Sequence, residues 1–150
     1  MYERVLHPTD GSENAEVATK HAIEIARRFD APLHALYVVD VSAVQSTDAF
    51  ATSNFEATVE ALETEGTERI EAVRERAERE GVEVTDEMVQ GKPAETITEA
   101  ADPDDVVVMG THGRSGIDRY LIGSTTKKVV RTAEVPVVTI PMTELGESEE

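Results

Sequence analysis

The sequence predicts an α/β protein built on one open, five-stranded parallel sheet with helices on both faces. Strand and helix signals alternate along the chain, and the predicted strand at residues 106–109 is apolar at every position. A continuous apolar run is typical of a parallel strand buried on both faces, and strict alternation favours right-handed strand–helix–strand crossovers. No repeat or linker divides the chain. We therefore expect residues 1–142 to form one domain and residues 143–150 to be a disordered acidic tail.

Each predicted element rests on apolar spacing and on turn residues. The predicted strands are residues 4–7, 33–39, 82–89, 106–109 and 135–140, and the predicted helices, with apolar residues three and four apart, are 15–29, 55–80, 93–101 and 124–132. Pro136 favours an edge position for the last strand, or the start of that strand. Residues 42–54 lack a period and are interpreted as a mobile connection, and the Glu/Arg-rich run at 74–80 as a solvated helix face.

The composition excludes several classes of protein. With 31 acidic and 14 basic residues, the formal net charge is −17, which argues against binding to a nucleic-acid backbone. The absence of cysteine excludes a thiolate nucleophile, a disulfide scaffold and a thiolate-ligated metal. No targeting segment and no membrane-spanning apolar run is visible, so we expect a cytoplasmic protein without a membrane partner. The acid surplus suggests a salt-loving source, and an ordinary acidic cytosolic protein is the alternative.

Two strand exits carry the residues best suited to bind a ligand. The first is the turn Pro8-Thr9-Asp10 with the following Gly11-Ser12, and the second begins at Gly110. A strand order of 3-2-1-4-5 would place strands one and four side by side where the order reverses, and ligands of open parallel sheets bind at such a point. Both exits would then border one crevice.

The second exit suits a polyphosphate. Gly110 and Gly113 permit close backbone approach, and Gly123-Ser124 opens a helix whose free N–H groups attract anions. The segment 111–131 also carries a local surplus of positive charge. It contains Arg114, Arg119, Lys127, Lys128 and Arg131 against the single acid Asp118.

The glycine–serine pattern is neither a GxGxxG motif nor a P-loop. It reads G-x2-G-x9-G-S and follows a first strand that ends in Pro-Thr-Asp-Gly-Ser and a second that ends in Tyr-Val-Val-Asp. In these features, and over about residues 2–142, the chain resembles the universal stress protein family, and within it the ATP-binding branch. The resemblance implies a Rossmann-like fold of the adenine nucleotide alpha hydrolase type.

The resemblance also implies a ligand, a partner and a set of binding residues. The ligand would be ATP, with Mg²⁺ or Mn²⁺ and Asp10 as a metal ligand, and the partner a second copy of the chain joined through the fifth strand between Pro136 and Ile140. The protein would act as a stress-response regulator on an unknown downstream protein. Adenine and ribose would contact Pro8, Thr9, Asp10, Val38, Met109 and Gly110, and the phosphates would contact His112, Gly113, Arg114, Gly123, Ser124, Thr125 and Thr126.

Other interpretations stay open beside this one. Asp10 would also serve as a plain helix cap, Val38 and Met109 as core residues, and His112 as a solvated loop residue. A dimeric interaction module that binds no nucleotide, or a cyclic one, is the main alternative function. An enzyme is disfavoured because no catalytic motif or general base is evident, so at most slow ATP hydrolysis is expected. A phospho-receiver would need an acidic third strand exit, where Gln90 and Gly91 stand.

Overall fold

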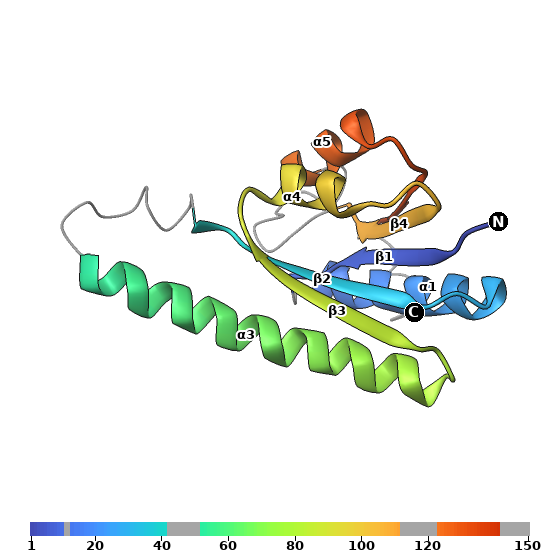
Figure 1. Ribbon diagram of the computed structural model, residues 1–150, viewed down its shortest axis with the longest axis horizontal. Coiled ribbons are helices and arrows are strands. Elements are labelled where there is room, and N and C mark those ends of the chain that lie inside the picture. Colours follow the sequence, from blue (N-terminus) through green and yellow to red (C-terminus); the bar gives the residue numbers. More distant parts are fainter. Residues whose placement is uncertain (11–12, 42–51, 112–122, 142–150) are drawn as a thin grey trace.

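The computed structural model describes residues 1–10, 13–41, 52–111 and 123–141 of the chain. Its strands form one parallel sheet in the order β3-β2-β1-β4-β5 (Figure 1). This confirms the predicted fold class and strand order. The chain adds β2 and β3 on one side of β1 and then β4 and β5 on the other, so the strand order reverses between β1 and β4, as expected for a doubly wound α/β fold.

Burial of the strands follows their place in the sheet. The strands are β1 (Arg4–Pro8), β2 (Leu33–Val39), β3 (Val84–Gln90), β4 (Asp105–Gly110) and β5 (Val137–Ile140). The inner strands β2 and β4 are buried at almost every residue, whereas the edge strands β3 and β5 are half-exposed. The last strand lies at an edge, one of the two positions that Pro136 favours, but it begins at Val137, two residues later than predicted. The Pro136 carbonyl accepts a hydrogen bond from the Val107 amide of β4 at 3.0 Å.

The described helices are α1 (Glu13–Phe29), α3 (Thr52–Arg79), α4 (Pro93–Ala100) and α5 (Ser124–Thr132). The start of α3 corrects one prediction, because residues 52–54 belong to the helix and not to a connection. Thr, Ser and Asn are residue types favoured at the start of a helix, but they are polar. The apolar spacing used for the prediction starts only at Phe55, so it could not include them. Residues 42–51 and 143–150, predicted to be mobile, lie outside the described residues. No described helix is long and apolar enough to cross a membrane.

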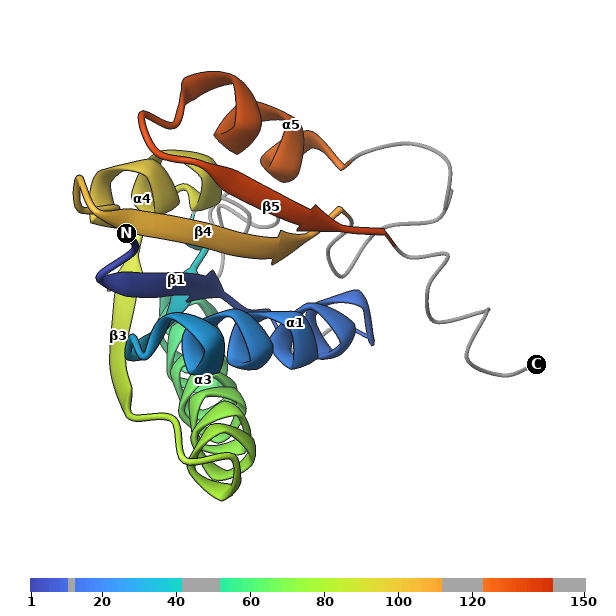
Figure 2. The ribbon, with the colours of Figure 1, turned by 90° about the vertical axis from the view of Figure 1, so that its right-hand side faces the viewer.

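The helices cover the sheet in two layers. Helices α1 and α3 lie on one face, and α4 and α5 on the other (Figure 2). Neighbouring residues of one strand therefore enter different cores: Val106 and Val108 pack toward α1 and α3, while Val107 and Met109 pack toward α4 and α5. This alternation explains why the strand at the centre of the sheet is apolar throughout.

A buried ion pair fixes the amino ends of β1 and β4. The Arg4 guanidinium donates to both carboxylate oxygens of Asp105, from Nε at 3.0 Å and from Nη2 at 2.7 Å, and Nη2 also donates to the carbonyl of Ala100 at the end of α4. Asp105 in turn accepts from the Asp102 amide at 2.8 Å. Because both Asp105 oxygens accept hydrogen bonds and Arg4 is partly exposed, the buried carboxylate is tolerated at moderate cost, and the pair helps to specify the register of the two strands.

Gly66 lies in the middle of α3, where glycine is normally unfavourable. The reason is the ring of Tyr37 on β2: a Cβ atom at position 66 would lie 2.6 Å from Tyr37 Cδ1 and 3.0 Å from Met88 Cε. Tyr37 is itself buried in the core formed by β2 and α3. The close approach of helix and sheet at this point therefore requires a residue without a side chain.

We expect Gly66→Ala to lower the free energy of unfolding by about 1–3 kcal/mol, because overpacking outweighs the gain of about 0.5–1 kcal/mol that alanine brings to a helix. Urea unfolding measures the effect. In a Tyr37→Leu background the same substitution should become neutral or stabilising. A Gly66→Ala protein more stable than the parent would contradict the proposed contact.

Candidate functional site

The carboxyl ends of β1 and β4 lie side by side at the point where the strand order reverses. The two strands pair in parallel, with Arg4 opposite Asp105 and Leu6 opposite Val107. β1 ends at Pro8 and β4 at Gly110, and the helices that follow them, α1 and α5, lie on opposite faces of the sheet (Figure 2). The structure therefore brings the two predicted strand exits to one edge, between diverging helices, where α/β proteins bind ligands.

The β1 exit is held firmly against β2. The Thr9 amide donates to the Leu36 carbonyl at 2.9 Å, and Thr9 is buried, whereas Pro8 and Asp10 are half-buried. Val38 lies two residues beyond Leu36 on β2 and is also half-buried, packed against the α4 and α5 core. The predicted adenine and ribose residues of β1 and β2 thus lie at the same end of adjacent strands.

The β4 exit is tied to the start of α5 by two hydrogen bonds and to β5 by a third. The Gly123 amide donates to the Thr111 carbonyl at 2.7 Å, and the Thr111 amide donates to Ile140 of β5 at 3.0 Å. The Thr126 hydroxyl donates to the Gly110 carbonyl at 2.9 Å. These bonds place the first turn of α5 directly beside the end of β4, as the glycine–serine pattern predicts.

The first turn of α5 offers backbone donors that no described residue caps. Gly123 is the N-cap residue in an extended conformation, and no side chain caps the helix. Ser124 is exposed and Thr125 half-buried, whereas Thr126 is buried with its hydroxyl directed at Gly110. Unpaired N–H groups and the helix dipole make such an end a site for an anion. Of the predicted phosphate contacts, His112, Gly113 and Arg114 lie outside the described residues.

A metal ion would find few protein ligands at this edge. Within the described part of the chain, no three His, Asp or Glu side chains are grouped so that they could hold a metal. Asp10 fits only the arrangement in which one carboxylate and the phosphates of a nucleotide share a Mg²⁺ or Mn²⁺ ion. The Met109 side chain is buried in the core, so only its backbone is placed to meet a ligand.

Sequence reasoning missed His7, which lies directly below the β1 exit and is fully buried. Its Nδ1 lies 2.9 Å from the Val108 carbonyl, which only accepts, so Nδ1 carries the proton; Nε2 lies 2.7 Å from the Thr19 hydroxyl of α1. Burial lowers the pKa of His7 to about 4, although the hydrogen bond to Val108 opposes the shift. The neutral imidazole therefore links β1 to both β4 and α1.

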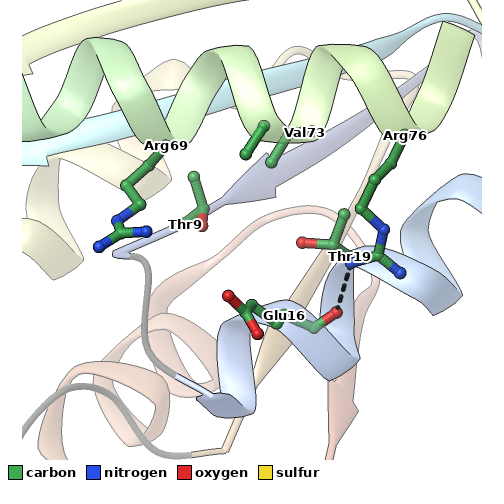
Figure 3. Close-up of a pocket in the computed structure, with 7 residues that line it drawn as sticks. Thr9, Glu16, Thr19, Arg69, Val73 and Arg76 are labelled. Atoms are coloured by element: carbon green, nitrogen blue, oxygen red, sulfur yellow. Dashed lines mark hydrogen bonds between the residues drawn. The ribbon is translucent and has the colours of Figure 1, made fainter.

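The charged face of α3 also differs from the prediction. Arg74, placed in a solvated run, donates to the Val84 carbonyl and pairs with Asp86 of β3. Arg69 and Arg76 border a cavity of about 270 Å³ between α1 and α3, next to Thr9 (Figure 3). Arg69 and Arg76 are seven residues apart, so the sequence already indicates that they share one face of the helix. The spacing does not indicate which element that face contacts.

Comparison with known proteins agrees with the geometry. Residues 1–141 match the model of the universal stress protein family. A universal stress protein of Methanocaldococcus jannaschii is 41% identical over 142 residues, which cover 93% of this chain and 82% of that protein.

Solved structures share the fold. The universal stress protein UspA from Lactobacillus plantarum matches with a TM-score of 0.83 at 30% identity, over 93% of this chain and 97% of that one. A universal stress protein from Archaeoglobus fulgidus, solved in complex with dAMP, matches with a TM-score of 0.64 at 20% identity, over 93% and 98% of the two chains. At that identity the second similarity concerns the fold alone.

We expect stability to decrease as the pH falls from about 6.5 to about 4, because the unfolded chain protonates His7 in this range and the folded chain does not. A shift of this size corresponds to roughly 3 kcal/mol. Urea unfolding at a series of pH values should show a flatter profile for His7→Gln than for the parent and for the control His21→Gln. An NMR titration that places the His7 imidazole near pH 6.5 in the folded protein would contradict this assignment.

Proposed function

Because the chain belongs to the universal stress protein family, we propose that it binds ATP at the β1 and β4 exits and acts in the cytoplasm as a nucleotide-dependent regulator of a stress response. The observation that carries the proposal is the start of α5: a helix without a side-chain cap, fixed beside the end of β4 by Gly123 and Thr126.

The phosphates require several donors at once. A charge at one helix end gains about 0.3–1 kcal/mol, whereas micromolar affinity needs about 8 kcal/mol. The amides of Ser124 and Thr125, with their hydroxyl groups, supply part of this, and we propose that His112, Gly113 and Arg114 add further contacts. Lys127, exposed one turn into α5, contributes positive charge. A triphosphate offers enough oxygens to use these donors together, which a single carboxylate does not.

The ends of β1 and β2 are the proposed site for the base and sugar. We propose that adenine lies against Pro8, Thr9 and Val38, and that the half-buried Asp10 carboxylate accepts from the ribose hydroxyls or shares a Mg²⁺ or Mn²⁺ ion with the phosphates. The buried bond from the Thr9 amide to Leu36 keeps this exit rigid. Rigid elements at both exits lower the entropy lost on binding.

Ser124→Pro tests the helix-end contact with little disturbance. Proline is tolerated at the first helical position, and Gly123 has the extended conformation, ψ 156°, that a following proline requires. The substitution removes one N–H group, and we expect it to weaken ATP binding about tenfold, in keeping with a hydrogen bond to a charged group. Calorimetric titration with ATP and Mg²⁺ at high salt measures the affinity.

Ser124→Ala is the matched control, because it removes the hydroxyl and keeps the N–H; it should weaken binding less than Ser124→Pro. Equal affinity of the parent and the proline variant would remove the helix-end contact. No saturable ATP binding below about 1 mM would favour an interaction module without nucleotide, and tighter binding of cyclic AMP than of ATP would favour the cyclic ligand.

We further propose that the protein is a homodimer joined through β5. This strand forms an open edge of the sheet, and its residues Val137 and Val138 are only half-buried. The carbonyls of Pro136 and Ile140 bond to β4, so by the alternation of a strand the amides of Val137 and Thr139 point outward. An unpaired edge of this kind is suited to pair with its own copy.

Thr139→Pro should convert the dimer to a monomer, because proline removes an outward N–H and leaves the bonds to β4 in place. Light scattering coupled to size-exclusion chromatography should give twice the 16.3 kDa of one chain for the parent and one chain mass for the variant. A monomeric parent protein would refute the proposal.

The acid surplus supports a salt-adapted protein. We expect the fold to be lost when the ionic strength falls from about 1 M to about 0.01 M, since the Debye length grows from about 3 to about 30 Å and the charge of −17 is no longer screened. Circular dichroism during dialysis follows the change. A fold that persists at low salt would identify an ordinary acidic protein instead.

A further inference from the structure

The polar cavity between α1 and α3 lies away from α5. Its volume is about 270 Å³, and α1 contributes Glu16 and Thr19 while α3 contributes Arg69, Val73 and Arg76 (Figure 3). The cavity reaches Thr9 at its inner end. It therefore adjoins the nucleotide crevice but lies on the face of the sheet opposite to the helix end proposed to bind the phosphates (Figure 2).

The two arginines are incompletely paired. Arg76 Nη1 donates to the Glu16 carbonyl at 3.2 Å, and Arg69 Nη2 lies 3.9 Å from a Glu65 carboxylate oxygen, at the limit of an ion pair. The Arg69 side chain is 40% exposed, but its Nε atom is buried and makes no hydrogen bond with any described residue. A buried donor of this kind is rare in folded proteins, and the usual explanation is a bound water or ion.

Among the residues that line the cavity, the two arginines are the main hydrogen-bond donors for a ligand. The Thr19 hydroxyl is already engaged with His7 and with the Ala15 carbonyl. Val73 is buried and gives the cavity an apolar wall, which strengthens electrostatic attraction at short range. Glu16 is exposed, and in the described structure no ion pair joins its carboxylate to Arg69 or Arg76, so the charged lining sums to one positive charge.

We propose that this cavity binds a phosphate-class oxyanion through Arg69 and Arg76, at a site separate from the nucleotide crevice. The Nε and Nη groups of Arg69 form a planar fork that matches two oxygens of one anion, and Arg76, two helical turns further along, supplies a second guanidinium. A doubly charged tetrahedral anion uses donors from both sides better than a single carboxylate does. Glu16 at the rim opposes binding and sets its strength.

Titration with inorganic phosphate in the absence of nucleotide tests the proposal. We expect Arg69→Gln and Arg76→Gln each to weaken phosphate binding at least tenfold, and Arg69→Lys to weaken it because the charge remains but the fork is lost. Glu16→Gln should tighten binding several-fold. The controls are Arg131→Gln and Glu134→Gln, which remove one positive and one negative charge from exposed residues near the end of α5. The phosphate affinity of both control variants should stay within twofold of that of the parent.

Phosphate affinity that does not respond to Arg69→Gln, in a variant shown by circular dichroism to be folded, would overturn the proposal. The proposal would also be overturned if Arg131→Gln changed phosphate affinity as much as Arg69→Gln, or Glu134→Gln as much as Glu16→Gln, because net charge alone would then explain the effects. The opposite responses of Glu16→Gln and Arg69→Gln support a local site even if one arginine variant is unstable.

The source of the phosphate group is separated by a second titration, with ATP. If ATP displaces phosphate, and Arg69→Gln weakens both ligands equally, the cavity belongs to the nucleotide crevice and the separate site is refuted. If phosphate binds in the expected pattern while Ser124→Pro weakens ATP alone, both sites stand. If phosphate binds in this pattern and ATP does not bind, the separate site stands and the proposed nucleotide function fails.

Discussion

The parallel pairing of β1 with β4 at the centre of the sheet is the constraint on which the remaining structure depends. Both strands are covered on both faces, so apart from the hydrogen-bonded His7 their buried middle residues are apolar and the polar groups lie at the strand ends. At the amino ends, Arg4 and Asp105 fix the register; at the carboxyl ends, Pro8 and Gly110 emerge beside each other. The same pairing therefore specifies the core and positions the candidate site.

The candidate site is held in shape mainly by groups that point away from a ligand. His7 links β1 to Val108 of β4 and to Thr19 of α1, immediately below the β1 exit. On the other side, Thr126 and Gly123 bind the end of β4 through side chain and backbone. A ligand would thus meet backbone positions that are already fixed, which is the condition under which weak individual contacts sum to a useful affinity.

Charge is distributed unevenly over this acidic molecule. Six glutamates of α3 are exposed, whereas several of the 14 basic residues are turned inward: Arg4 toward Asp105, Arg74 toward β3, and Arg76 toward α1. Arg4 and Arg74 face the carboxylates of Asp105 and Asp86, whereas the two arginines of the cavity between α1 and α3 outnumber the one acid in its lining. The net charge of −17 therefore does not describe that cavity.

The sequence by itself located the five strands to within two residues at their ends and indicated the order of the sheet, because apolar period and turn residues act locally and crossover rules leave few topologies. It also indicated the glycine–serine start of α5. Tertiary structure alone decided that Thr52 already belongs to α3, that Gly66 makes room for Tyr37, and that Arg69 and Arg76 face α1. Helical spacing shows which residues share a face, but only packing determines whether that face meets water, a strand or another helix.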